Sequence, residues 1–161
     1  MQQTGTNYTQ SVGGVVIHEG KVLLGRHTYG AGNGLLIIPG GYVDYGESPQ
    51  QAVAREFMEE TGVTVEAQDV LGVRFNTHDW YVVFRARYVS GDIHADETEN
   101  SEVIWMDVNE ALAADDVPQL TRQMIRAAIG PGVGFTTADY EGGSKYAPCS
   151  LLCKALGDHY A

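Results

Sequence analysis

The stretch from Gly41 to Val63 constrains the fold of this chain most, because turn-forming residues in its first part are followed by a helical pattern. Ser48 and Gln51 have the spacing of a capping box, and Pro49 falls at the first helical position, where its missing N–H group is harmless. Gly62 can adopt the left-handed conformation that ends a helix. The stretch therefore predicts a loop followed by a helix that begins at Pro49 and ends before Gly62.

This predicted helix, over residues 49–61, has one apolar and one acidic face. At about 100° per residue, Glu56, Glu59 and Glu60 fall on one arc, opposite four apolar side chains. Glu56 and Glu60 are four positions apart, so their like charges destabilise the helix unless a cation lies between them. Proteins bind Mg²⁺ through carboxylates together with substrate phosphates. The acidic face is thus a candidate metal site, and a solvated acidic surface is the alternative interpretation.

The spacing of the whole stretch decides between these interpretations. It matches the pattern G-x5-E-x7-R-E-U-x-E-E-x-G-U, where U is a bulky apolar residue. The matching residues are Gly41, Glu47, Arg55, Glu56, Phe57, Glu59, Glu60, Gly62 and Val63. This pattern is the signature of the Nudix hydrolases, and the chain resembles that family over about residues 10–130. Phe57 departs from the family's usual aliphatic residue, which affects local packing and leaves the carboxylates unchanged.

The resemblance implies an α/β fold, namely the Nudix-type α/β/α sandwich with a mixed β-sheet between helices. The hydrophobic pattern along the chain agrees with this fold. It predicts a hairpin over residues 11–26 with a tight turn at Glu19 and Gly20, strands over residues 35–38, 70–75, 80–89 and 102–107, a helical turn capped by Asp107, and an amphipathic helix over residues 118–129.

A chain of 161 residues is long enough for one well-packed domain. We expect a Nudix domain over residues 1–130, with residues 1–10 loose. Residues 131–161 form a C-terminal extension, which we expect to pack on the domain or at a subunit interface. Its clearest pattern predicts a short helix from Pro148 to Leu156, with Cys149 and Cys153 as buried thiols.

Charge and hydropathy restrict the partners of the chain. A formal net charge of −11 argues against a broad grip on nucleic-acid backbone, which needs Lys and Arg to neutralise phosphates. The sequence has no apolar run of about 18 residues and does not begin like a signal peptide, so we expect no membrane partner and a cytoplasmic protein. A homodimer is one state to test, because Nudix domains are often dimers; the sequence leaves the oligomeric state open.

The resemblance implies that Mg²⁺ or Mn²⁺ is bound by the residue before the first glycine of the pattern and by the last two helical glutamates. The glutamate after the arginine assists the metal or the attacking water. Among these residues, Glu56 is our first choice as the general base and Glu60 our second. Glu99, in an acidic loop, is expected to complete the site ahead of Glu97 and Glu102. The predicted metal ligands are therefore Gly40, Glu56, Glu59, Glu60 and Glu99.

Other residues are expected to bind substrate or to support the loop and helix. Arg26, at the end of a strand, is a candidate for contacting substrate phosphate. Gly41 lets the backbone approach a ligand closely. Tyr81 lies eighteen residues beyond Val63, where a tyrosine is associated with diadenosine polyphosphates in the family. The residues with expected structural roles are Glu47, Arg55 and Gly62, with Arg55 paired to Glu47 or Glu59.

The predicted function is metal-dependent hydrolysis of a phosphoanhydride in a nucleoside diphosphate linked to another group: a nucleoside triphosphate, a dinucleoside polyphosphate or a nucleotide sugar. The chain has no proline between Pro49 and Pro118, which argues against the ADP-ribose subclass. Two alternatives are a Nudix domain that binds a nucleotide or sugar nucleotide as a regulator without turnover, and a purely structural cation-binding domain. The complete set of carboxylates in the pattern favours the enzyme.

Overall fold

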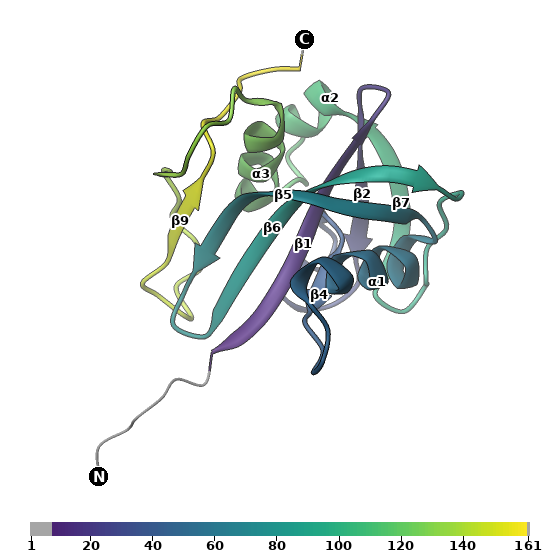
Figure 1. Ribbon diagram of the computed structural model, residues 1–161, viewed down its shortest axis with the longest axis horizontal. Coiled ribbons are helices and arrows are strands. Elements are labelled where there is room, and N and C mark those ends of the chain that lie inside the picture. Colours follow the sequence, from purple (N-terminus) through teal and green to yellow (C-terminus); the bar gives the residue numbers. More distant parts are fainter. Residues whose placement is uncertain (1–7, 161) are drawn as a thin grey trace.

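The computed structural model describes residues 8–160 and shows a mixed β-sheet between helices, which confirms the predicted fold class (Figure 1). Helix α1 lies on one face of the sheet, and α2 and α3 lie on the other. The elements, in chain order, are β1 (Thr9–His18), β2 (Lys21–His27), a 3-10 turn (Gly30–Gly32), β3 (Leu36–Ile37), β4 (Gly40–Tyr42), α1 (Pro49–Thr61), β5 (Thr64–Phe75), β6 (Asp79–Ser90), β7 (Asn100–Asp107), α2 (Val108–Ala113), α3 (Gln119–Ile129), β8 (Thr136–Thr137) and β9 (Ser150–Cys153).

Strand β1 is the centre of the sheet, because it pairs with three other strands. It runs parallel to β6 over residues 9–16, and its last residues form the predicted antiparallel hairpin with β2. Near its start, residues 11–13 pair with β4. The longest path through the sheet is β3-β2-β1-β6-β5-β9-β8, with β7 paired to β2. The pairing of β1 with β4 brings the strand before α1 to the middle of the molecule.

Helix α1 has the boundaries that the sequence predicts. The Ser48 side chain accepts a hydrogen bond from the Gln51 backbone, and the Gln51 side chain accepts one from the Ser48 backbone. Gly62 ends the helix with φ of 75°. Phe57 is fully buried, and a Cβ on Gly14 of β1 would lie 2.7 Å from its ring. The missing side chain at position 14 therefore provides the space for the unusual aromatic residue.

Helix α3 covers the opposite face of the sheet. Met124, Ile125 and Ala128 are buried on its inner side as predicted, whereas Leu120 is only partly buried near the start of the helix. The buried residues pack with those of β1, β6 and β9 in one hydrophobic cluster. The two faces of the sheet thus have separate cores, one under α1 and one under α3.

Two predictions about the chain ends need correction. Residues 1–7 of the predicted loose segment lie outside the described residues, and Thr9 already belongs to β1. The predicted helix from Pro148 to Leu156 is wrong, because residues 150–153 form β9, which pairs antiparallel with β5. Leu151 and Cys153 are buried and the residue between them is half-buried, which is the alternation of a strand. Pairing with a distant strand determines this segment.

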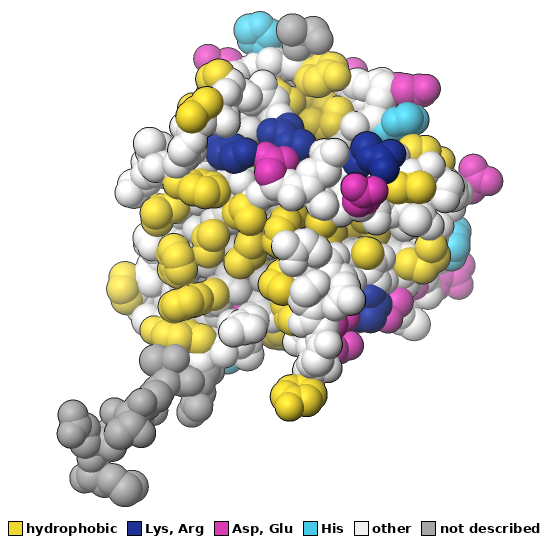
Figure 2. Space-filling view, in the orientation of Figure 1, with side chains coloured by type: hydrophobic (Ala, Val, Ile, Leu, Met, Phe, Trp, Pro, Cys, Tyr) yellow, Lys and Arg dark blue, Asp and Glu magenta, His cyan; other side chains and the backbone are white. Residues whose placement is uncertain are grey.

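Part of the sheet face that α1 leaves uncovered is apolar. Figure 2 shows hydrophobic side chains gathered on this face, where Phe75 and Trp80 pack edge to face with ring centroids 5.3 Å apart. Trp80 is 46% exposed, and the neighbouring pair Val73 and Val82 is half-buried.

No helix among residues 8–160 is long and apolar enough to cross a bilayer.

Candidate active site

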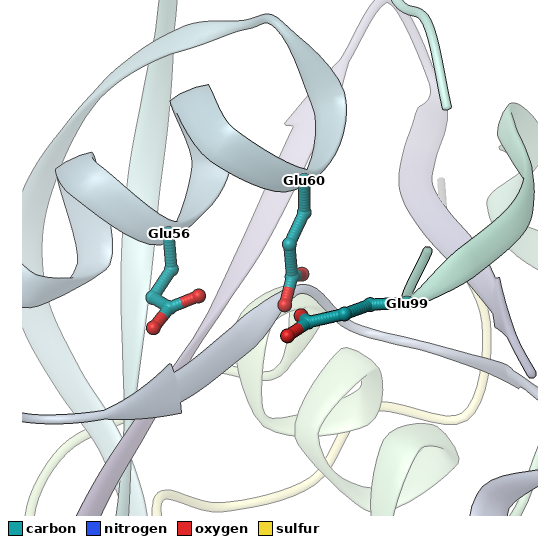
Figure 3. A group of neighbouring side chains, drawn as sticks. All are labelled: Glu56, Glu60 and Glu99. Atoms are coloured by element: carbon teal, nitrogen blue, oxygen red, sulfur yellow. The ribbon is translucent and has the colours of Figure 1, made fainter. Parts of the chain in front are cut away.

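Three carboxylates meet beside the middle of the sheet. Glu56 and Glu60 point from consecutive turns of α1, and Glu99 reaches them from the residue before β7 (Figure 3). One carboxylate oxygen from each residue lies within 4.8 Å of the others. Glu56 and Glu60 are buried, with 8% and 2% of their surface exposed. The structure therefore brings together three of the predicted metal ligands from two distant parts of the chain.

The cluster concentrates negative charge away from water. Burial, followed by the charge of Glu56 and a hydrogen bond with Glu99, raises the pKa of Glu60 to about 9. Burial also raises the pKa of Glu56, although the guanidinium of Arg55, 3.0 Å away, opposes this shift. Closely spaced oxygen donors with like charge are the ligand set that hard divalent cations prefer. The donors present thus fit the Mg²⁺ or Mn²⁺ that Nudix hydrolases typically need.

Two glycines allow β4 to lie against these carboxylates. A Cβ on Gly41 would lie 2.3 Å from Oε1 of Glu56, and a Cβ on Gly40 would lie 2.1 Å from the backbone oxygen of Val12. Neither distance is compatible with a side chain in this arrangement. The Gly40 N–H group donates a hydrogen bond of 3.3 Å to Glu60. The prediction that the Gly40 carbonyl binds the metal remains a prediction.

Arg55 connects the loop before α1 to the acidic face of the helix. Its guanidinium donates two hydrogen bonds to Glu47, of 2.6 and 3.1 Å, and one of 3.0 Å to the Tyr42 carbonyl. It also contacts Glu56 and, at 3.2 Å, Glu59. Glu47 and Glu59, which were predicted as alternative partners of Arg55, therefore both pair with it. The exposed carboxylate of Glu59 pairs with Arg55 and lies outside the three-carboxylate cluster, so its role as a metal ligand remains a prediction.

A cavity of about 660 Å³ opens next to the cluster, which is in the size range of ligand pockets. Gly40 and Gly41 form part of its wall, so the cavity and the carboxylates are neighbours. The other lining residues are Ser11, His27, Tyr29, Ala31, Gly32, Leu35, Ile37, Ile38, Tyr42, Arg74, Asp79, Tyr81, Pro118, Gln119, Leu120, Thr121, Tyr140, Glu141, Gly142 and Gly143.

The residues predicted to bind substrate differ in their relation to this cavity. Gly41 and Tyr81 line it, whereas Trp80 does not, in agreement with the strand alternation that allows only one of two adjacent residues to face a pocket. Arg26 is not among the lining residues. Its guanidinium is bound to Glu102 at 2.9 Å and to Asp116 at 3.0 Å. The structure therefore does not support its predicted contact with substrate phosphate. Glu102, which was a further candidate for the metal site, pairs with Arg26 instead.

Several cavity residues were not singled out from the sequence. His27 lines the cavity and stacks on Tyr29 with ring centroids 5.5 Å apart. Arg74 and Asp79 form an ion pair of 2.6 Å in the wall, and Tyr140 reaches the cavity from the C-terminal segment. The available signal was the arginine within the apolar run of β5, where a charge needs a buried partner.

Comparisons with known proteins agree with this site. Residues 7–128 match the model of the NUDIX domain. A MutT-like protein of Streptomyces ambofaciens is 39% identical over 106 residues, covering 64% of this chain and 66% of its own length. The NAD-capped RNA hydrolase NudC of Escherichia coli O9:H4 (strain HS) is 35% identical over 129 residues, covering 74% of this chain and 46% of its own length. This chain therefore spans from about half to just under two thirds of the length of these relatives.

A solved structure gives the same result at the level of the fold. The crystal structure of a NUDIX hydrolase from Nitrosomonas europaea superimposes with a TM-score of 0.67 at 25% identity, covering 76% of this chain and 70% of that one. The residues that match the NUDIX domain model, 7–128, include helix α1 and the acidic loop, which supply the three carboxylates of the cluster. The chain belongs to the Nudix hydrolase family.

Proposed function

We propose that the protein is a metal-dependent pyrophosphohydrolase, which cleaves a phosphoanhydride bond in a nucleoside diphosphate linked to another group. The main support is the placement of three carboxylates within 4.8 Å of one another beside a cavity of about 660 Å³. The cluster can hold the cation and the phosphates, and the cavity has room for the rest of a nucleotide.

Glu60 and Glu99, together with Glu56, would hold Mg²⁺ or Mn²⁺. When bound, the cation neutralises charge on the transferring phosphoryl group and lowers the pKa of water. The chain's own residues supply the other steps. Arg55 holds the Glu56 carboxylate at 3.0 Å, and Gly41 leaves space for it.

In this proposal Glu56 removes the proton from the attacking water. Burial raises its pKa toward the range in which a carboxylate is an effective general base near neutral pH. Glu60 remains the second candidate, although its greater burial and its hydrogen bond from Gly40 suit a metal ligand better. The attack splits the anhydride and leaves two phosphate-containing products.

The substrate class follows from the site and from the named relatives together. A MutT-like protein and an NAD-capped RNA hydrolase are both similar to this chain. We therefore include nucleoside triphosphates, dinucleoside polyphosphates, nucleotide sugars and NAD among the candidates. The net charge of −11 disfavours a substrate that must be held along a nucleic-acid backbone.

The test is release of phosphate or nucleoside monophosphate from this panel and from ADP-ribose, with Mg²⁺ or Mn²⁺ and with the Glu60→Gln variant as the blank. One substrate cleaved far faster than the others identifies the substrate class. If nothing is cleaved but a nucleotide raises the melting temperature, the proposed hydrolysis is wrong and the chain acts as a nucleotide-binding module.

A further inference from the structure

Apart from the carboxylate cluster that lies next to it, the cavity has a polar region in its own wall, formed by Arg74 of β5 and Asp79 of β6. Nη2 of Arg74 donates a hydrogen bond of 2.6 Å to Asp79. The hydroxyl groups of Thr9 and Ser11 donate two more to the same carboxylate, at 2.8 and 2.6 Å. Asp79 is therefore fully engaged in holding Arg74, and the pair has no net charge.

Arg74 retains hydrogen-bonding capacity. Arginine has five N–H donors, and among residues 8–160 the Arg74 side chain donates its hydrogen bond to Asp79 through Nη2. Its Nε is buried and unpaired within this part of the chain, so the donors open to the cavity are those at the Nη end of the guanidinium. The centre of its guanidinium lies 5.4 Å from the centroid of the Tyr81 ring, which also lines the cavity. Arg74 is thus a fixed, partly unsatisfied donor group beside an aromatic ring.

The C-terminal segment forms the adjoining wall, although it lies beyond the residues that match the family. Its strand β9 places Leu151 opposite Arg74 on β5. The Ala138 N–H group donates a hydrogen bond of 2.9 Å to the Leu151 carbonyl, and the Gln123 side chain of α3 donates one of 3.0 Å to the Asp139 carbonyl. These bonds fix the chain just before Tyr140, which lines the cavity together with Tyr81 and Leu120.

This lining suits a planar aromatic group. Two tyrosine rings and a leucine offer apolar contact, and base–aromatic stacking contributes about 1–3 kcal/mol per base. The neutral Arg74–Asp79 pair gives no net attraction for another phosphate. Because free guanidinium donors pair with two adjacent acceptors, they match the O6 and N7 atoms of guanine, whereas adenine presents an N–H₂ donor in place of O6.

We propose that Arg74, positioned by Asp79, together with Tyr140 of the C-terminal segment selects the substrate by its base and favours guanine over adenine. This inference deepens the proposed function and rests on it for the identity of the site. The phosphates lie toward Gly40 and the carboxylates, and the base lies toward Arg74. Tyr81 lies beside Arg74, with its ring centroid 5.4 Å from the centre of the guanidinium.

The experiment measures binding of GMP and AMP to the full chain by isothermal titration calorimetry, which does not require turnover. The unsubstituted protein should bind GMP about tenfold more tightly than AMP, at the scale of one good bidentate contact. Arg74→Lys keeps the charge opposite Asp79 but loses the planar pair of guanidinium donors, so the preference for GMP over AMP should fall to about twofold or less. Tyr140→Ala should weaken both nucleotides by about tenfold through lost stacking, with little change in their ratio.

The control is Arg87→Lys, an exposed arginine on β6 that pairs with Glu66 outside the cavity; it should leave both affinities unchanged. Asp79→Asn keeps the size of the side chain and is the second variant if Arg74→Lys does not fold; it should also reduce the preference. Equal binding of GMP and AMP by the unsubstituted protein, or an unchanged preference in the folded variants, overturns the proposal.

Turnover separates the two conclusions. If GMP is preferred and Arg74→Lys removes the preference, but no nucleotide is cleaved, base selection stands and the proposed hydrolysis fails. If nucleotides are cleaved with equal efficiency for both bases and Arg74→Lys leaves this unchanged, hydrolysis stands and base selection fails.

Discussion

Two polar regions, the carboxylate cluster beside the cavity and the Arg74–Asp79 pair in its wall, are built in opposite ways. At the carboxylate cluster, three like-charged groups share a small volume, and Arg55 is the cation in contact with one of them. At the Arg74–Asp79 pair, opposite charges lie 2.6 Å apart, and two hydroxyl groups donate hydrogen bonds to the Asp79 carboxylate. The first region is short of positive charge, and the second is already balanced.

Because of this difference, we assign the reaction to the carboxylate cluster and the choice of ligand to the Arg74–Asp79 pair. The carboxylate cluster, in which burial raises the pKa of Glu56 and Glu60, is poised to receive a cation, and it gains most when charge changes during a reaction. A balanced pair gains little from charge, so it recognises shape and hydrogen-bonding pattern. Changes at the carboxylates should therefore act on turnover, and changes at the pair should act on the choice of ligand.

The largest effect is expected for Glu60→Gln compared with Glu59→Gln. Loss of a buried ligand of the cation should cost several kcal/mol of transition-state stabilisation, or about a thousandfold in kcat/KM. Glu59 is exposed and paired with Arg55, so its variant should lose about tenfold or less. Steady-state kinetics on the substrate identified by the panel measure both. Equal losses would place Glu59 in the metal site and remove the distinction made from the structure.

The next largest effect concerns the segment that supports the balanced pair. Leu151 of β9 is fully buried in the core under α3, whereas Leu152 is half-buried on the other face. Leu151→Ala should lower the free energy of unfolding by about 3 kcal/mol, and Leu152→Ala by about 1 kcal/mol or less. Urea denaturation compares the two. Similar losses in both variants would contradict the alternation of a strand and favour the helix expected from the sequence.

A third comparison uses the two glycines that face the two regions. The new methyl group of Gly41→Ala would displace the Glu56 carboxylate, and a misplacement of about 1 Å can cost about a hundredfold in turnover. In Gly13→Ala the methyl group would lie 2.0 Å from the Tyr81 hydroxyl, so it should mainly weaken nucleotide binding. Kinetics and calorimetry on both variants test this division. A loss of turnover without weaker nucleotide binding in Gly13→Ala would contradict this division between the two glycines.

The two regions also differ in how much of them the sequence predicts. Around the carboxylates, local rules were sufficient: the capping box, Pro49 and Gly62 define α1, and the spacing of Glu56 and Glu60 places both on one face. Even Glu99, which is distant in sequence, was predicted because the family pattern includes an acidic loop. Glu59 pairs with Arg55 outside the cluster, since helical spacing gives the face of a side chain but not the partner that it contacts.

The balanced pair could not be predicted in the same way. Arg74 and Asp79 contact each other because β5 and β6 form a hairpin, and Tyr140 approaches them only because β9 pairs with β5. Strand pairing at long range has no local signal in one sequence. The residues around Cys149 and Cys153 resembled a helix for the same reason, since a short apolar run fits either period.

The smallest effect is expected for Arg55→Lys. This variant tests whether the loop before α1 contributes to the reaction at the carboxylate cluster. Lysine keeps the charge but cannot bridge Glu47, Glu56 and the Tyr42 carbonyl at once. We expect kcat/KM to fall by about tenfold, equivalent to about 1.4 kcal/mol, because the Glu56 carboxylate loses its fixed orientation. Binding preference between GMP and AMP should not change, since Arg55 does not line the cavity. Arg87→Lys is the matched control for a lysine in place of a paired arginine, and a loss no larger than that of the control would show that Arg55 contributes only to the surface of the loop.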